Sequence, residues 1–139
     1  MCYDISRAAE EIFYYLGFEV RHVSVYKNTH NNRIKTLLSR GSSHALLEIK
    51  SEKGWLAIDP HMGIVYTDAH NNPIATEEIL KSKQSINEQR RIHQIFQDNY
   101  VIVCGLYSRH GKFYKPFTPL PDVSWQQFLA TRNTIAVNK

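Results

Sequence analysis

Residues 43 to 60 read SHALLEIKSEKGWLAIDP, and this stretch decides the fold. Two apolar runs, at 43–50 and 55–59, flank the polar connection Ser51-Glu52-Lys53-Gly54. A connection of that length joins the two arms of a β-hairpin, so the pattern predicts an antiparallel pair of strands. The start of the first strand and the end of the second then lie at the same end of the sheet. We therefore expect His44 and Asp59 to be neighbours across the pair.

A helix is predicted upstream of this hairpin, over residues 4 to 16. Apolar side chains recur there at helical spacing, and we expect this stripe to face the protein interior: Ile5, Ala8, Ala9, Ile12, Phe13 and Leu16. Arg7, Glu10 and Glu11 are expected on the opposite, solvent face. Gly17 ends the helix, and Cys2 lies just before or within its first turn. Residues 18 to 26 then alternate between apolar and polar, which predicts a half-buried strand.

The rest of the chain supplies further short elements and no sign of a second domain. We expect a short strand at 64–66, a helical stretch at 76–80, a polar helix at 87–97 with Ile92 and Phe96 inward, a last strand at 100–107, and a short helix capped by Ser124. A leading helix followed by an antiparallel sheet defines an α+β class. The prediction is a single domain over residues 1–139, in which the N-terminal helix carrying the cysteine packs against the sheet carrying the histidine and the aspartate.

Composition narrows the classes of function. The chain has 139 residues, 42% hydrophobic and 22% charged, which is typical of a globular protein, and a formal net charge of +4. No apolar stretch approaches the roughly 20 residues that a membrane helix needs, and no signal peptide is visible, so we expect a cytoplasmic protein without a membrane span. Basic residues are spread along the chain rather than gathered in a stripe, which argues against nucleic-acid binding.

The two cysteines differ in their surroundings. Cys104 follows Val101, Ile102 and Val103 and is interpreted as a small apolar filler of a buried strand. Cys2 is followed by polar residues at the start of a helix, where the helix dipole favours a thiolate. Two cysteines this far apart form neither a disulfide framework nor a zinc site, and no other residue spacing indicates a metal or a cofactor.

Cys2, His44 and Asp59 form a candidate catalytic triad. Taken alone, a histidine among apolar residues is more often a core residue than a catalyst, and an aspartate before Pro60 is more often a turn residue. Taken together, a thiol, an imidazole and a carboxylate are the parts of a nucleophilic cysteine site, since the carboxylate orients the imidazole and the imidazole activates the thiol.

The same residues resemble the transglutaminase-like superfamily of papain-like cysteine enzymes. That family's pattern is a cysteine followed by a helix ending in Leu-Gly, then a His-Ala-hydrophobic strand, then a strand that contains tryptophan and ends in Asp-Pro. In this chain the pattern is met by Cys2-Tyr3-Asp4, Leu16-Gly17, His44-Ala45-Leu46-Leu47 and Gly54-Trp55-Leu56-Ala57-Ile58-Asp59-Pro60. The resemblance covers about residues 2 to 60. It implies Cys2 as nucleophile, His44 as general base and acid, and Asp59 as the group that orients His44.

The C-terminal part adds candidates for substrate binding. Residues 106–114 and 121–125 resemble a segment of bacterial transglutaminase-like proteins that are associated with surface-polysaccharide gene neighbourhoods. Arg109 and His110, beside Gly111, are candidates for binding a substrate carboxylate, although an exposed turn explains them equally well. Trp55 is a further candidate for substrate contact, and His61, directly after Pro60, could reach the cleft.

The resemblance implies an acyl-transfer enzyme that acts on an amide or ester through a thioester, with a protein, peptide or glycan-linked substrate. In the family a substantial segment precedes the cysteine, whereas here only Met1 does, so we expect a domain truncated at its N-terminus. The backbone N–H of Cys2 would supply one oxyanion donor, and the source of a second is open. The alternative is a catalytically lapsed module that binds a glycan or a protein partner. A homodimer, in which a second copy covers an exposed edge, is a further arrangement we consider.

Overall fold

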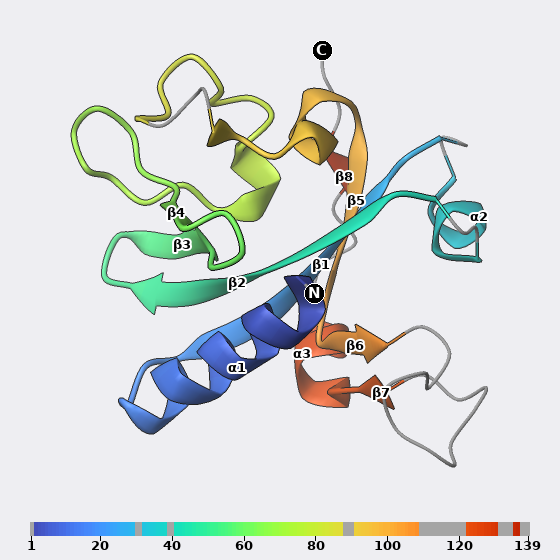
Figure 1. The fold of residues 1–139 in the computed structure, drawn as a ribbon, viewed down its shortest axis with the longest axis horizontal. Coiled ribbons are helices and arrows are strands. Elements are labelled where there is room, and N and C mark those ends of the chain that lie inside the picture. The colour runs from blue at the N-terminus through green and yellow to red at the C-terminus, as the bar shows by residue number, and fades with distance from the viewer. Residues whose placement is uncertain are drawn as a thin grey trace.

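The computed structural model describes residues 2–29, 32–38, 41–87, 91–108, 122–130 and 135–136. The helices and strands are, in chain order, α1 (Cys2–Tyr15), β1 (Val20–Lys27), α2 (Arg33–Leu38), β2 (Ser43–Ser51), β3 (Gly54–Asp59), β4 (Ile64–Val65), β5 (Tyr100–Cys104), β6 (Leu106–Ser108), β7 (Asp122–Val123), α3 (Trp125–Ala130) and β8 (Ile135–Ala136). Two short 3-10 helices, η1 (Thr76–Glu78) and η3 (Gln94–Gln97), lie between β4 and β5. The predicted α+β class, with an N-terminal helix packed on an antiparallel sheet, is confirmed (Figure 1).

The main sheet has the strand order β4-β3-β2-β1-β5-β8, and its pairs are antiparallel. The predicted hairpin is present, because β2 pairs with β3 through a turn in which Gly54 adopts φ 127°. The register pairs Leu47 with Ile58 and so places Asp59 opposite Leu46. His44, two residues earlier, is then the diagonal neighbour of Asp59 on the same face.

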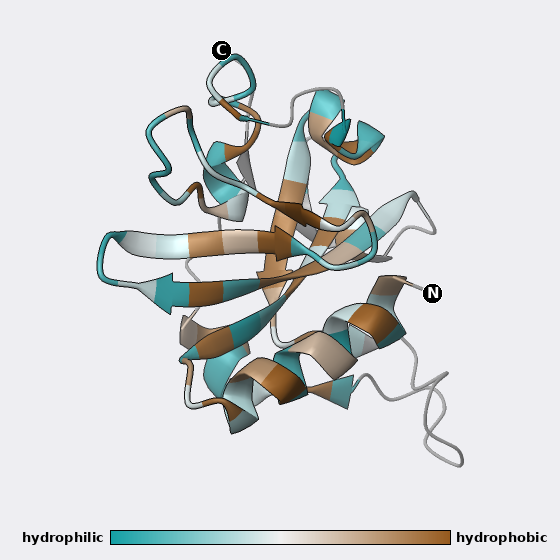
Figure 2. Ribbon diagram, turned by 60° about the vertical axis from the view of Figure 1, so that its left-hand side comes forward, coloured by the Kyte–Doolittle hydropathy of each residue, from teal (hydrophilic) through white to brown (hydrophobic). Residues whose placement is uncertain are grey.

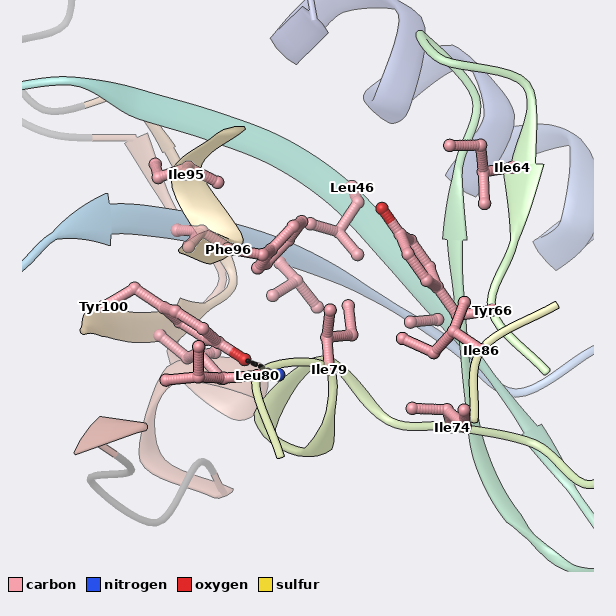
Figure 3. Close-up of a cluster of buried hydrophobic side chains, with 14 of the residues drawn as sticks. Leu46, Ile64, Tyr66, Ile74, Ile79, Leu80, Ile86, Ile95, Phe96 and Tyr100 are labelled. Atoms are coloured by element: carbon pink, nitrogen blue, oxygen red, sulfur yellow. Dashed lines mark hydrogen bonds between the residues drawn. The ribbon is translucent and has the colours of Figure 1, made fainter. Parts of the chain in front are cut away.

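The larger apolar core lies on one face of this sheet. Val23, Leu46 and Ile102 contribute from the central strands, and the segment between β4 and β5 covers them with Ile79 and Phe96. Figure 3 shows Leu46, Ile79 and Phe96 together with Tyr66 and Tyr100, whose rings contact the Phe96 ring edge-on. Because the face is closed by an irregular segment rather than a long helix, its loops can hold polar side chains beside the sheet end.

Helix α1 covers the opposite face of the sheet, and it packs with its polar side inward and much of its apolar side toward solvent. Its buried residues are Ser6 and Glu10, while Ile5, Ile12 and Leu16 are 40%, 60% and 66% exposed. The prediction that the apolar stripe faces the interior is therefore wrong for these three residues and for Ala8, which is also exposed, and the prediction that Glu10 faces solvent is wrong as well. Hydropathy along α1 can be followed in Figure 2.

The polar side of α1 packs inward because the groups beneath it are polar too. The Glu10 carboxylate accepts hydrogen bonds from the Tyr107 hydroxyl at 3.0 Å and from Gln127 Nε2 at 2.9 Å. Burial raises the pKa of Glu10, although these two hydrogen bonds act against the rise. Arg7 lies over the Tyr107 ring and forms an ion pair with Asp122 at 3.1 Å. A hydrogen-bonded polar layer thus joins α1 to the C-terminal elements.

This orientation of α1 gives a direct prediction for stability. Replacing Ile12 with serine should change the free energy of unfolding by less than about 0.5 kcal/mol, because the side chain is already in water. A helix packed by its apolar stripe would instead lose roughly 2 to 4 kcal/mol. Urea unfolding of the wild type and the variant distinguishes the two orientations of the helix.

Three other predictions of local structure need correction. Of the predicted helix at 87–97, the described residues form no α-helix: η3 is a 3-10 helix, and Ile92 and His93 before it have no regular secondary structure. The helical stretch at 76–80 is likewise a 3-10 helix followed by turns. The strand predicted at 100–107 is interrupted at Gly105, which has φ 69° and lies so close to α3 that a Cβ there would be 2.7 Å from the Ser124 carbonyl oxygen. It is not the last strand, since β7 and β8 follow.

Within the described residues, no helix is both long and apolar enough to cross a membrane.

Candidate active site

Three elements bring Cys2, His44 and Asp59 together at one end of the sheet. Cys2 is the first residue of α1, His44 the second of β2, and Asp59 the last of β3. His44 Nε2 lies 2.5 Å from Asp59 Oδ2, and the thiol of Cys2 is hydrogen-bonded to the His44 side chain. With Nε2 engaged by the carboxylate, Nδ1 is the ring nitrogen left for the thiol. The imidazole thus lies between the sulfur and the carboxylate.

Asp59 is held in place by a second hydrogen bond. Its Oδ1 accepts from the backbone N–H of Met62 at 3.0 Å, across the turn that begins at Pro60. The carboxylate is 0% exposed and His44 only 2% exposed. A buried carboxyl group without partners would be costly, and these two hydrogen bonds satisfy both of its oxygens.

The environment of His44 favours its protonated form. Burial alone lowers the pKa of an imidazole, but the hydrogen bonds and charges of Asp59 and Cys2 outweigh it and raise the pKa of His44 to about 9. At neutral pH the ring is therefore an imidazolium that can donate a proton.

The environment of Cys2 favours the thiolate. Burial raises the pKa of the thiol, yet the hydrogen bond and charge of His44, with backbone hydrogen bonds from Ala45 and Tyr3, outweigh burial and lower the pKa below its ordinary value. The N-terminal end of α1 acts in the same direction through its partial positive charge. The shifts of both pKa values thus favour a thiolate–imidazolium pair, the reactive form of a cysteine nucleophile.

Two further histidines surround the His44 ring. His93, which immediately precedes η3, stacks on His44 with ring centroids 4.0 Å apart and planes 5° apart. His61 contacts the His44 ring edge-on, with ring centroids 6.1 Å apart. The sequence predicts that His61 can reach the cleft but assigns no role to His93. His93 lies 49 residues beyond His44 in the sequence, in an irregular segment, and no motif there relates it to His44.

A polar groove of about 310 Å³ opens beside His93. Its lining residues come from the end of β1, the start of β2 and η3: Lys27, Ser42, His93, Gln94, Ile95, Gln97 and Asp98. Lys27 and Asp98 form an exposed ion pair at 2.7 Å, so these two opposite charges in the groove compensate each other. It adjoins the site through the His93 ring.

Of the three proposed substrate-binding residues, the structure describes only Trp55, and it does not place Trp55 at this site. Trp55 lies at the opposite end of β3 from Asp59, where Arg21 covers its ring at 4.0 Å. There it lines a separate groove of about 440 Å³ together with Glu11, Tyr14 and Phe18. Arg109 and His110 lie outside the described residues.

Cys104 occupies the place expected for it. It is 1% exposed in β5 and belongs to the larger apolar core. Among the residues that the structure describes, no group of three or more His, Cys, Asp or Glu side chains is arranged to hold a metal ion.

The fold and the site together define an α+β domain in which a half-buried cysteine at the N-terminus of a helix lies beside a buried histidine and aspartate. Comparison of the chain with family models, curated proteins and solved structures gives no match.

Proposed function

We propose that this protein is a transglutaminase-like cysteine acyl-transfer enzyme, in which Cys2 is the nucleophile, His44 the acid and base, and Asp59 the residue that orients His44. The observation that carries the proposal is the double engagement of the His44 ring, by Asp59 on one side and by the Cys2 thiol on the other. The order of the three elements, helix then two paired strands, supports the family resemblance of residues 2 to 60.

The first half-reaction acylates the enzyme. The Cys2 thiolate attacks the carbonyl carbon of an amide or ester, a C–S bond forms, and the carbonyl π electrons move to oxygen. When the tetrahedral adduct collapses, the bond to the amine or alcohol breaks, and His44 donates its proton to that leaving group. The products are a thioester on Cys2, a neutral imidazole and the released amine or alcohol.

The second half-reaction returns the enzyme to its starting state. The neutral His44 ring removes a proton from water or an amine, whose oxygen or nitrogen attacks the thioester carbonyl. The C–S bond breaks, the sulfur leaves as thiolate, and the imidazolium forms again beside it. Water gives hydrolysis, and an amine gives transamidation. Asp59 keeps Nε2 occupied through both steps, so that Nδ1 always faces the sulfur.

The charge that develops on the carbonyl oxygen would be stabilised at the N-terminal end of α1. Backbone N–H groups of the first helical turn have no partner within the helix, and the helix dipole is positive there. The backbone N–H of Cys2 is the donor we assign first. Donors of this kind contribute roughly 10²- to 10³-fold to the rate each.

Alkylation by iodoacetamide tests the proposal without knowledge of the substrate. We expect Cys2 to react at pH 6, well below the range in which a free thiol ionises, because His44 holds it as thiolate. His44→Ala should slow this reaction by about tenfold or more, since the imidazolium is lost. Peptide mass spectrometry separates Cys2 from Cys104, whose burial in the core provides an internal control.

The same measurement examines the alternative of a catalytically lapsed binding module. Such a module needs no activated thiol, so Cys2 would titrate like a free cysteine and His44→Ala would leave its reactivity unchanged. Either result would contradict the proposed enzyme.

A further inference from the structure

The imidazole of His93 is fixed in one tautomer and one orientation. Its Nδ1 accepts a hydrogen bond from the backbone N–H of Ile95 at 3.2 Å, so the ring proton resides on Nε2 and the ring is neutral. This bond caps η3, whose next residues, Ile95 and Phe96, are 4% and 0% exposed. The His93 ring is therefore anchored to the core and cannot turn independently of it.

This anchored ring lies flat on the ring of His44. The centroid distance of 4.0 Å and the angle of 5° describe a parallel stack, in contrast to the edge-on contact of the exposed His61. A flat neighbour restricts rotation of the His44 ring out of its plane. That plane contains both Nδ1 and Nε2, and therefore sets the directions toward the sulfur and the carboxylate.

We propose that His93 is a positioning residue, whose neutral ring holds the His44 imidazolium in the plane that joins Cys2 to Asp59 and stabilises its charge through the stacked face. The inference rests on the proposed function, because it acts through His44. His93 itself makes no contact with the reacting sulfur in this assignment.

The charges around the stack are consistent with a neutral His93 on a charged His44. Burial, and after it the charge of His44, lower the pKa of His93, while Asp59 acts against them and His61 with them. In the adjoining groove Lys27 and Asp98 neutralise each other. A cation against an aromatic face is stabilised by the ring electrons, and the stabilisation is larger where water is excluded. Water is largely excluded from the His44 ring, because this side chain is only 2% exposed.

Three substitutions at His93 distinguish the effect of its stacked ring from the effect of the hydrogen bond that caps η3. His93→Ala removes the ring and the capping acceptor. His93→Phe keeps a flat ring but loses the acceptor for Ile95. His93→Asn keeps an acceptor suited to a helix N-terminus but loses the ring. His70→Ala, which removes an exposed imidazole from the turn around Asp68, is the matched control.

The pH–rate profile of Cys2 alkylation is the measurement. For His93→Ala and His93→Asn we expect the apparent pKa of the thiol to rise by about one unit, with roughly tenfold slower alkylation below it. His93→Phe should retain most of the wild-type rate, and the control His70→Ala should match the wild type. NMR titration of the His44 ring is a second readout, and its pKa should fall in the alanine and asparagine variants only.

The outcomes that overturn the inference are distinct from failure of the proposed function. If His93→Asn behaves as wild type and His93→Phe as the alanine variant, the residue serves only as a cap. If all three match the wild type, the stack has no effect on His44. A wild-type Cys2 that titrates like free cysteine would instead remove the proposed function, and this inference with it.

Discussion

Replacing Asp59 with alanine is expected to lower turnover of an activated ester, such as p-nitrophenyl acetate, by roughly 10³- to 10⁴-fold. The carboxylate raises the pKa of His44 and fixes the direction of its ring, so its loss removes both the imidazolium and the orientation of Nδ1 toward the sulfur. Cys2 would remain in place but would lose most of its thiolate, because the His44 charge that favours the thiolate would be gone. Initial rates at pH 7 measure the effect.

Asp59→Asn divides this effect into charge and geometry. The amide oxygen can still accept a hydrogen bond from Nε2, but it carries no charge to favour the imidazolium. We therefore expect a loss smaller than that of the alanine variant, and a pKa of His44 that falls from about 9 in an NMR titration. Asp98→Asn, which removes an exposed carboxylate from the surface pair with Lys27, should leave the rate unchanged. Equal activity of wild type and Asp59→Ala would show that the carboxylate does not orient a catalytic base.

The pairing of His44 with Asp59 could be predicted because it depends on local geometry alone. The connection predicted at 51–54 is even shorter in the structure, where only Glu52 and Lys53 lie between the strands. So short a connection leaves two strands little freedom of register, and strand alternation then places both side chains on one face. The position of Cys2 could not be predicted from the hairpin, because the hairpin does not determine where the preceding helix packs. The family resemblance implies a position beside His44, and the structure places Cys2 there.

The orientation of α1 could not be predicted from its own sequence. An amphipathic pattern identifies an apolar stripe but not the surface that the helix packs on. Here that surface includes Tyr107 and Gln127, which lie about 100 residues away in the sequence and offer hydrogen bonds to Glu10. A buried carboxylate with two partners is tolerated, so the polar side could pack inward. No periodicity within residues 2 to 15 contains this information.

His93 was missed for a related reason. The segment that carries it has no regular secondary structure, so no spacing rule relates it to the sheet. The sequence pattern predicts a polar helix at 87–97, on whose surface His93 would have no defined neighbour. Only the tertiary fold, in which this segment closes the core face, sets the His93 ring against His44.

The second large effect is a loss of stability in acid that arises from His22. This side chain is 0% exposed in β1, between the rings of Tyr3 at 6.0 Å and Tyr107 at 4.9 Å, and its two ring nitrogens have no hydrogen-bond partner among the described residues. Burial, with a smaller effect from the charge of Arg7, lowers the pKa of His22 from 6.5 to about 4. The folded protein therefore resists protonation that the unfolded chain accepts.

The sign follows from counting protons. Between pH 6.5 and 4 the unfolded chain binds a proton at His22 and the folded protein does not, so the free energy of unfolding falls as the pH is lowered through this window. The full difference corresponds to about 3 kcal/mol. Above pH 6.5 both states are neutral at His22 and the effect vanishes.

His22→Phe isolates this contribution. Phenylalanine keeps a ring between the two tyrosines but cannot titrate, so the slope of stability against pH should decrease below pH 6.5 by up to about 1.4 kcal/mol per pH unit. The Cys2–His44 pair, whose pKa values also shift on folding, contributes to the pH dependence of stability as well. It is present in both proteins, however, and cancels in the difference between them. Urea unfolding at several pH values between 4.5 and 7.5 measures both slopes, and equal slopes would contradict the prediction. Because His22 contacts the helix that carries Cys2, acid should weaken the packing of α1 on the sheet and so separate the thiol from His44.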